Sequence, residues 1–572
     1  MKRNLPVCRW PLTGRSFLTL FCLVCLFSSG CRTAPSPGGS SSGQSAGPGT
    51  PGYGGVFHRA FSSSLLSIDP RDVTDSYTHE VARQIFDGLV EFDANAQVVP
   101  AIAEKWEISA DRQTYTFTLR SNCRFHAVNG KNGAPTRNQG RLVTAEDVRY
   151  TFLRLLEPSG KSPRGKFFWV IDGAEKYAKG ETKDISGIVV VASDTISLHL
   201  AKPFSPFLSL LALCNAFILP REDVEFLKEE FARSPVGTGP FLWSGQSGDT
   251  ITLRANPNYF RGRPYLDEIV FSVIRDEMER FQAFKAGKLS EVDVPDPEYK
   301  NIRNDPGWSP HFQEVSRWGT QYLGFNPTHP PFDNAKVRQA FNYAIDRETI
   351  VKLILNERAR VARGVLPPGI LGFNPNLKGY DFYPERGRQL LAEAGFPEGK
   401  GFPEIALQIN TDSMHNRIAE FIVANLRDIG VTCMLKELDF AEHIRTIAAG
   451  QAAFFRLGWT VDYPDPDNFL YTMFHSSNFG MEGNLSLYKN PLVDEILEKA
   501  RYEIALQDRI QLYQSAEQLI VDDAPWVFVY HYTTHVLHQP NVRGLLLTPM
   551  GQPFVAYRNI WLAAGSGTTG SH

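Results

Sequence analysis

A run of Gly, Ser and Pro follows Cys31 and divides the chain into a short N-terminal segment and a long body. The run reads RTAPSPGGSSSGQSAGPGTPGYGG and has almost no apolar side chains, so it cannot bury enough surface to offset the entropy lost on ordering. We therefore predict a flexible tether. The folded structure must come from the residues after it, and a chain of 572 residues is long enough for at least two domain-sized lobes.

The segment before the tether has the pattern of a secretory signal. Basic residues precede an apolar run at 17–27, and small residues at 28–30 lead to Cys31. The apolar run is shorter than the ~20 residues needed to span a bilayer, so we expect cleavage and not a permanent membrane helix. The segment resembles a bacterial lipoprotein signal, in which the cysteine becomes the acylated N-terminus. It departs from that pattern at Ser28, where Leu is usual, and plain secretion is the alternative.

The charge balance and the cysteines exclude some classes of protein. The chain has 59 Lys and Arg against 62 Asp and Glu, a formal net charge of -3, whereas a nucleic-acid binder usually shows a basic excess. We therefore expect no nucleic-acid partner. The body retains Cys123, Cys214 and Cys433 without the spacing of a metal site, and at most one disulfide could form among them.

Hydrophobic periodicity in residues 96–212 predicts a compact α+β unit. Residues 114–120 alternate between apolar and polar side chains, which is the period of a half-buried strand. Thr144 and Asp147 resemble a capping box, and an apolar stripe spaced for a helix follows them. Residues 188–200 predict a hairpin around a Ser-Asp turn.

The pattern after Gln321 predicts a lobe of alternating strands and helices. A short strand from Gln321 is followed by a helix that opens at Asp333 and another that Asp346 caps. Strand, helix and strand are then expected at 405–409, 418–426 and 431–435, and two long helices at 493–500 and 510–520.

Eight segments resemble, in the same order, the family 5 solute-binding proteins of bacterial oligopeptide and dipeptide ABC importers. The resemblance extends from about residue 54 to residue 562. The segments are SIDP at 67–70, VVPAIAEKWEIS with DRQTYTFTLR at 98–120, TAEDVRYTFLRLL at 144–156, SPVGTGPF at 234–241, NPNYFRGRPYLDEIVF at 256–271, FDNAKVRQAFNYAIDRETIV at 332–351, GWTVDYPDPDNF at 458–469 and DDAPWVFVY at 522–530.

The resemblance implies an α/β fold of the type II periplasmic-binding-protein class, with two lobes, a hinge and an extra small α+β domain. Ligand would be enclosed between the lobes by hinge closure. The implied divisions are a signal peptide at 1–30, a lipid-anchored linker at 31–54, lobe I at 55–95, the extra domain at 96–212, lobe I again at 213–315, lobe II at 316–525, a return to lobe I at 526–562 and a flexible tail at 563–572.

The resemblance also implies a function. The chain is expected to be a monomeric, extracytoplasmic lipoprotein of the cell envelope that captures short peptides without a cofactor. It would deliver them to an ABC transporter permease and ATPase complex in the membrane. A ligand of another kind is the first alternative, because fold does not settle ligand: related binders take metal chelates, haem, opines or sugars. A secreted hydrolase is the second.

Peptides of many sequences share only their termini and backbone, and the segment GWTVDYPDPDNF offers groups for these. Asp462 matches the family's aspartate that binds the peptide α-amine, which suits a charge-assisted hydrogen bond. Gly458 and Trp459 match the strand that pairs with the peptide backbone. The alternative for Asp462 is a turn residue before Pro464. The alternative for Trp459 is ordinary core packing.

Two further residues are candidates for contacts with the ligand. Arg456 matches a position that can bind the peptide carboxylate, for which a planar guanidinium is suited. The six residues from Arg456 to Asp462 would span about 20 Å in a strand, whereas a tripeptide spans about 10 Å, so a bend or the long side chain must close the gap. An ion pair within lobe II is the alternative role. Asn484 is a candidate for lining the cleft.

The residues that suggest an enzyme or a metal site lack the surrounding pattern. His531 and His535 have helical ligand spacing, but their segment is rich in aromatic and β-branched residues and predicts a strand. Asp462, Asp465 and Asp467 lack the Gly and Glu of a calcium loop. Residues 160–162 resemble the end of a phosphate-binding loop without its first glycine. We therefore predict no catalytic residue and no metal.

Residues 127–143 form a polar, Gly-rich insertion relative to the family pattern. We expect it to lie on the surface of the extra domain.

Overall fold

The computed structural model describes residues 50–65, 67–160 and 162–563. The predicted signal at 1–30, Cys31 and most of the predicted tether lie outside these residues. Among the described helices, none is both long and apolar enough to cross a membrane.

A four-stranded sheet near the start of the body carries one hydrophobic core. Its order is β1-β12-β11-β10, in which β1 is parallel to β12 and the other pairs are antiparallel. Helix α1 packs into the same core, where Val81 and Ile85 join Phe57 and Phe271. The elements are β1 Val56–Phe61, α1 Ser76–Ile85, β10 Phe241–Ser247, β11 Thr250–Ala255 and β12 Glu268–Val273.

A second four-stranded sheet forms the predicted α+β unit. Its order is β4-β5-β9-β8, all antiparallel, and the expected strand, hairpin and helix of this region are confirmed. The Thr144 and Asp147 capping box is present at the start of α2, because Thr144 N donates to Asp147 at 2.8 Å. The elements are β4 Ala103–Ile108, β5 Thr114–Leu119, α2 Ala145–Leu155, α3 Ala174–Ala178, β8 Ile188–Ala192 and β9 Thr195–His199.

The insertion at 127–143 does more than lie on the surface of this unit. It contains a small hairpin, β6 Val128–Asn129 with β7 Ala134–Pro135, that packs beside β10. The backbone N of Arg137 and the amide of Asn138 donate to the buried Asp223 in α5 Arg221–Leu227, at 2.8 and 2.6 Å. Most of the insertion is exposed or half-buried, as expected of a surface loop, but its polar groups also form hydrogen bonds with residues outside 96–212.

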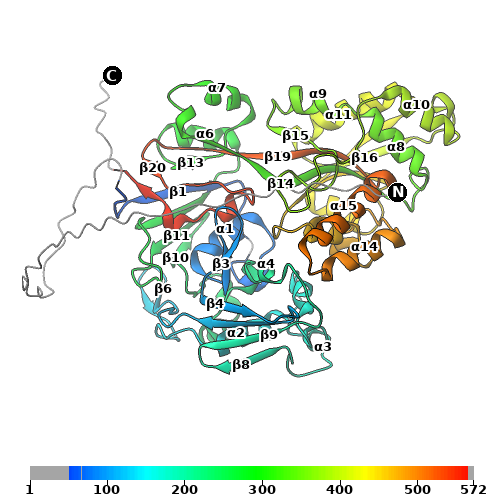
Figure 1. Cartoon of the computed structure of the whole chain (residues 1–572). Helices are drawn as coiled ribbons and strands as arrows, with labels where there is room; N and C mark the ends of the chain where they lie inside the picture. Colours follow the sequence, from blue (N-terminus) through cyan, green and yellow to red (C-terminus); the bar gives the residue numbers. More distant parts are fainter. Residues whose placement is uncertain (1–49, 66, 161, 564–572) are drawn as a thin grey trace, which may run out of the picture. The chain divides into compact units, whose positions relative to one another are not determined.

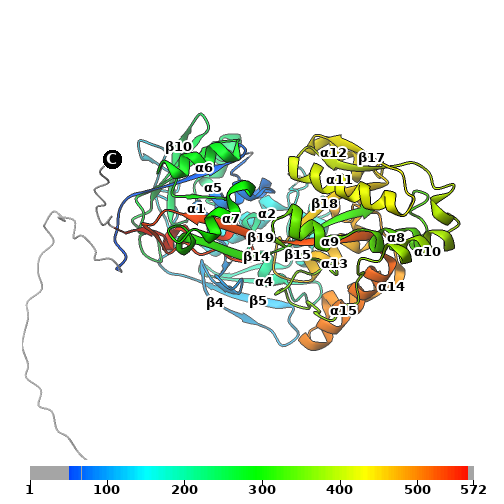
Figure 2. The ribbon, with the colours of Figure 1, turned by 90° about the horizontal axis from the view of Figure 1, so that it is seen from above.

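The largest sheet has seven strands in the order β13-β19-β14-β18-β16-β17, with β15 paired to β19. Strands β14 and β19 are its longest and lie side by side in Figures 1 and 2. The strands are β13 Glu291–Val292, β14 Phe312–Phe325, β15 Ala359–Val361, β16 Ile405–Asn410, β17 Cys433–Leu438, β18 Phe454–Thr460 and β19 Trp526–His538.

The expected short strand at Gln321 is only the second half of β14. The first half, from Phe312, has a mixed polar and apolar pattern in which no strand period stands out. Its apolar members Phe312 and Val315 pack near the cores of the earlier residues, whereas Leu323 and Phe325 belong to a separate core. Strands β14 and β19 therefore both run from the cores of the earlier residues to the separate core of the later ones, and both also contribute to the largest hydrophobic core, through Tyr322 and Trp526.

The β14–β19 ladder is interrupted between these two halves. Ser316 pairs with Thr533, and the next pair is Thr320 with His531, so three residues of β14 face one residue of β19. Such a bulge bends a strand and changes the direction of its side chains. Arg317 lies in the bulge.

Helices cover the faces of the largest sheet, and those expected from the sequence are present. Helix α8 begins after Asn334, one residue later than expected, because Asn334 accepts from Lys336 N at 2.9 Å. Asp346 caps α9 as predicted, through Thr349 N at 3.0 Å. The helices are α8 Ala335–Ala344, α9 Arg347–Thr349, α10 Pro384–Glu393, α11 Ser413–Asp428, α12 Phe440–Ala448, α13 Asp467–Phe474, α14 Pro491–Tyr502 and α15 Leu506–Asp523.

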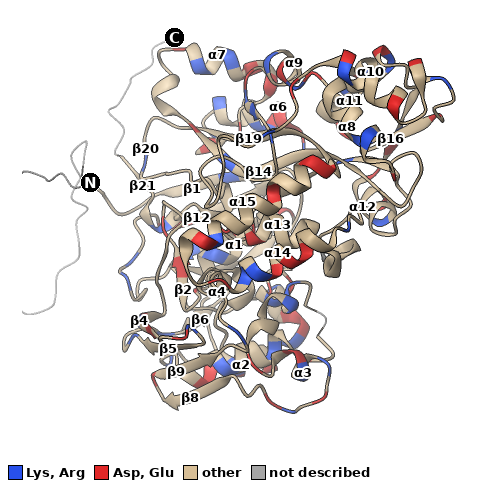
Figure 3. Ribbon diagram, turned by 45° about the vertical axis from the view of Figure 1, so that its right-hand side comes forward, with Lys and Arg blue, Asp and Glu red and all other residues tan. Residues whose placement is uncertain are grey.

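The remaining elements are short. They are β2 Val90–Phe92 paired with β3 Val98–Pro100, α4 Phe207–Leu211, α6 Glu277–Lys285, α7 Tyr299–Asn304, and β20 Val542–Arg543 paired with β21 Trp561–Leu562. Acidic and basic residues are interspersed along the described elements (Figure 3). Cys123, Cys214 and Cys433 are buried free thiols, and burial raises the pKa of Cys214 to about 12 and that of Cys433 to about 11.

Candidate functional site

A cavity of about 390 Å³ contains three of the residues singled out in the sequence, Gly458, Trp459 and Asp462. The end of β18 and the two residues that follow it form one wall. The other residues that line it come from separate parts of the chain: Val73, Thr74, Asp75, Ser76, His79, Arg164, Phe167, Leu213, Cys214, Asn215, Arg317, Phe440, Thr460, Val461, Met550, Pro553 and Phe554.

The carboxylate of Asp462 is held in place from two sides. Asn468 in α13 accepts from Asp462 N at 2.9 Å and donates to Asp462 Oδ2 at 3.3 Å. Arg164 donates to Asp462 Oδ1 at 3.0 Å, and the two charged side chains are 25% and 20% exposed. Because each carboxylate oxygen has two lone pairs, Asp462 can accept a further donor from within the cavity.

Strand β18 has an open backbone edge at the cavity. On one side it pairs with β14 along its whole length, from Phe454 to Thr460. On the other side β16 reaches only Phe455, and no described strand pairs with β18 beyond it. An extended ligand backbone can pair with such an edge.

Gly458 and Trp459 have structural roles beside this edge. A Cβ at Gly458 would lie 1.9 Å from the side-chain nitrogen Nε2 of Gln321, so a larger residue there would require the Gln321 side chain to move. The indole of Trp459 donates to Asn468 Oδ1 at 3.3 Å, and its ring packs partly against the core. Trp459 therefore combines core packing with a surface that faces the cavity.

Arg456 is not brought to the cavity. Its guanidinium contacts Gln321, and it lies 3.3 Å from both Asn410 Oδ1 and His415 Nδ1, between the sheet and α11. Burial, with Arg456 adding to it, lowers the pKa of His415 to about 4. These contacts are hydrogen bonds to neutral side chains, and among the described residues Arg456 does not form the ion pair that was the alternative for it.

Asn484 is also away from the cavity. It is fully buried, and its amide donates to the carbonyl oxygens of Tyr488 at 2.8 Å and His475 at 3.3 Å. Its own oxygen accepts from Tyr488 N at 3.2 Å. The side chain thus fixes the conformation of its loop and has no polar group left for a ligand in the cleft.

Two cavity residues, His79 and Arg317, were missed by the sequence reasoning. Nε2 of His79 is buried without a partner, and burial, reinforced by Arg83, lowers the pKa of His79 to about 3, so the ring is neutral. Arg317 also has a buried Nε without a partner. No sequence signal marks either residue, because His79 lies within a helix and Arg317 is aimed by a bulge.

The charges around the cavity are mixed. Asp75 and Asp462 supply two carboxylates, while Arg164 and Arg317 supply two guanidinium groups. Balanced charge of this kind suits a zwitterionic ligand better than a polyanion or a polycation.

The two histidines considered for metal binding have partners within the fold. His531 and His535 lie in β19 as predicted, and their rings contact Thr320 Oγ1 at 3.0 Å and Val294 O at 3.0 Å. Among the described residues, no group of three or more His, Cys, Asp or Glu side chains could hold a metal ion. Lys161, in the incomplete phosphate-loop pattern, lies outside the described residues.

Known proteins resemble the chain over most of its length. The family of bacterial extracellular solute-binding proteins, family 5 Middle, matches residues 97–481. Heme-binding protein A of Haemophilus influenzae is 32% identical over 85% of this chain and 89% of its own length. The dipeptide-binding protein of Escherichia coli is 29% identical over 85% of this chain and 91% of its own.

Solved structures support the same relationship. The periplasmic binding protein DppA of Helicobacter pylori, in complex with the peptide STSA, has a TM-score of 0.75 and 28% identity, covering 90% of this chain and 99% of its own. The expected two-lobed, type II periplasmic-binding-protein-like α/β fold is thereby confirmed. The chain belongs to the family 5 bacterial extracellular solute-binding proteins.

Proposed function

We propose that the protein is the extracytoplasmic substrate-binding lipoprotein of an ABC importer and that it captures short peptides in the cavity beside β18. The observation that carries the proposal is the position of Asp462, a fixed carboxylate with free lone pairs that lines the cavity. An α-ammonium group is the feature that all unmodified peptides present to such a carboxylate.

The open edge of β18 gives the second contact that peptides share. A ligand whose amine meets Asp462 could place its backbone along the residues after Phe455, where no described strand pairs. Main-chain hydrogen bonds of this kind do not depend on the ligand's side chains. The site can therefore accept many sequences.

The long strands β14 and β19 support capture by hinge closure. Each begins in one hydrophobic core and ends in another, so a bend at their shared bulge would move one lobe against the other. On this proposal the closed monomer is delivered to the permease and ATPase complex. The division into lobes at 96, 213, 316 and 526 is part of the same proposal.

Native mass spectrometry of the protein purified without refolding tests the choice of ligand. A co-purified mass that fragments as a short peptide supports the proposal. A porphyrin, a metal chelate or a sugar would contradict it and would support the alternative of a non-peptide ligand. That alternative is considered because one relative is named heme-binding protein A.

Membrane attachment depends on Cys31 in this proposal. We expect Cys31→Ser to move the protein from the membrane fraction to the soluble extracytoplasmic fraction, because the mature chain would lack its lipid. Cell fractionation with antibody detection measures this. Unchanged membrane association of the Ser variant would rule out a lipid anchor at Cys31.

A further inference from the structure

Arg317 has an unusual position in the largest sheet. It lies in the bulge of β14, where the ladder with β19 skips from Ser316 to Thr320. It lines the cavity that contains Asp462 and also an adjoining cavity of about 710 Å³, which includes Thr533 and Gln552. Bulges often serve to redirect a side chain at a functional site.

The register of the sheet places Arg317 opposite Asp462. Gly319 pairs with Thr460, and Val461 N donates to Trp318 O at 3.0 Å, so the antiparallel pairing continues past the end of β18. Opposite residues in such a pair have Cβ atoms about 5 Å apart. Even so, Asp462 forms its ion pair with Arg164 and not with Arg317.

The guanidinium of Arg317 has no partner among the residues that the structure describes. It forms no hydrogen bond or ion pair there, and its Nε is buried. The nearby carboxylate of Asp293 pairs with Arg59 instead, at 3.5 Å. The Arg317 side chain is partly buried, and because removing a cation from water is costly unless it is paired, this burial lowers the pKa of Arg317.

Gly551 leaves room for this guanidinium. A Cβ at Gly551 would lie 3.0 Å from Arg317 Nε and 3.3 Å from Cζ, so a side chain there would displace the group. The backbone of Gly551 has a φ of +89°, which disfavours other residues as well. The chain therefore keeps an unpaired cation in a defined place at the edge of the cavity.

We infer that Arg317, and not Arg456, binds the α-carboxylate of the peptide ligand. This inference rests on the proposed function, because it assumes that the ligand's amine meets Asp462. A planar guanidinium can bind a carboxylate through two parallel hydrogen bonds. With Arg317 and Asp462 at opposite register positions, both termini are engaged only by a short ligand, such as a dipeptide or a tripeptide.

Titration calorimetry with dialanine, trialanine and their C-terminal amides tests the inference. Wild-type protein should bind the free peptides about thirtyfold or more tightly than the amides, as expected when a buried charge pair loses one partner. Arg317→Gln should bind the free peptides about as weakly as wild type binds the amides, and should no longer distinguish the two. Arg317→Lys should recover part of the preference, because the charge remains.

Two further variants serve as comparisons. Arg275→Gln, at an arginine that is 70% exposed, should keep the wild-type preference. Arg456→Gln should keep it too, because Arg456 is directed into the space beside His415. Thermal melts would show that each variant is folded.

Several outcomes would overturn the inference, and they can be told apart. Equal affinity of wild type for dialanine and its amide, or a full preference retained by Arg317→Gln, would reject Arg317 as the carboxylate site. If Arg317 were rejected in this way but N-acetylation of the peptide still weakened its binding, the proposed function would remain supported. Failure of every free peptide to bind folded wild type would reject the proposed function and the inference together.

Discussion

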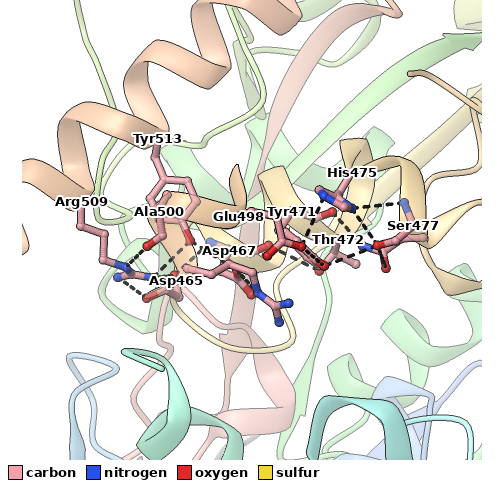
Figure 4. A network of polar contacts seen from close by, with 12 residues as sticks. Asp465, Asp467, Tyr471, Thr472, His475, Ser477, Glu498, Ala500, Arg509 and Tyr513 are labelled. Carbon is pink, nitrogen blue, oxygen red and sulfur yellow. Dashed lines mark hydrogen bonds and ion pairs between the residues drawn. The ribbon is translucent and has the colours of Figure 1, made fainter. Parts of the chain in front are cut away.

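Asp462 lies within five residues of Asp465 and Asp467 in the sequence, yet the surroundings of these carboxylates differ. Asp465 and Asp467 belong to a buried network with Arg509, Arg501 and Tyr513, part of which Figure 4 shows. Asp462 lies at the cavity instead, with a partly exposed carboxylate. The comparison separates charges that hold the fold from charges available to a ligand.

The buried network leaves little hydrogen-bonding capacity unused. Arg509 donates to both oxygens of Asp465, at 2.9 and 2.6 Å, and Asp467 accepts from Arg501 at 3.0 Å and from the hydroxyl of Tyr463 at 2.7 Å. Burial raises the pKa of Asp465, although Arg509 opposes the shift. In the cavity, by contrast, Nε of Arg317 and Nε2 of His79 are buried without partners. Unsatisfied groups that face a cavity are the ones to test for binding.

The largest effect on stability should come from the buried cluster. Arg509→Ala leaves the Asp465 carboxylate buried without its counter-charge, so we expect a loss of about 3–5 kcal/mol in the free energy of unfolding. Chemical denaturation followed by tryptophan fluorescence measures it. The affinity of the fraction that remains folded for dialanine should be unchanged.

Arg445→Ala is the matched control for that loss. Arg445 pairs with Glu442 at 2.6 Å on the surface, where the two side chains are 64% and 37% exposed. Exposed pairs add little to stability, so the unfolding midpoint should not move. A small effect of Arg509→Ala, no larger than the control, would remove the distinction between the buried network and Asp462.

A smaller effect, of opposite sign, is expected at the cavity. Arg164 places a positive charge against Asp462 and so repels the ligand's ammonium group. Arg164→Gln should therefore tighten the binding of dialanine by up to about tenfold, or ~1.4 kcal/mol. The gain, measured by calorimetry, should shrink as salt is added. Weaker binding by Arg164→Gln would show that Arg164 itself contacts the ligand.

Helices, strands and the main candidate for a ligand-binding residue were predictable from the sequence. The alternation at 114–120 and the capping box at Thr144 depend on local preferences, and both appear in the structure. Asp462 was found because its segment, GWTVDYPDPDNF, resembles that of the family, and it lines the cavity. Each of these features depends on residues that are close together in the chain, so it can be predicted from one sequence.

Features that depend on the relation between distant segments were not predictable. Arg456 and Gly458 lie close in the sequence, but the contacts of Arg456 with Gln321 and His415 hold it away from the cavity. Arg317 is placed by a bulge that depends on the register between β14 and β19. The buried partner of the insertion at 127–143, Asp223, is likewise remote in the sequence.

The most direct test of the central claim is a thermodynamic cycle at Asp462. Titration calorimetry would compare wild type and Asp462→Ala, each with dialanine and with N-acetyl-dialanine. Loss of one partner from a desolvated charge pair costs about 2–5 kcal/mol, so each change alone should weaken binding by about thirtyfold or more. Because both changes remove the same interaction, their losses should not add. Fully additive losses, or no loss on acetylation, would contradict the assignment of Asp462 to the peptide amine.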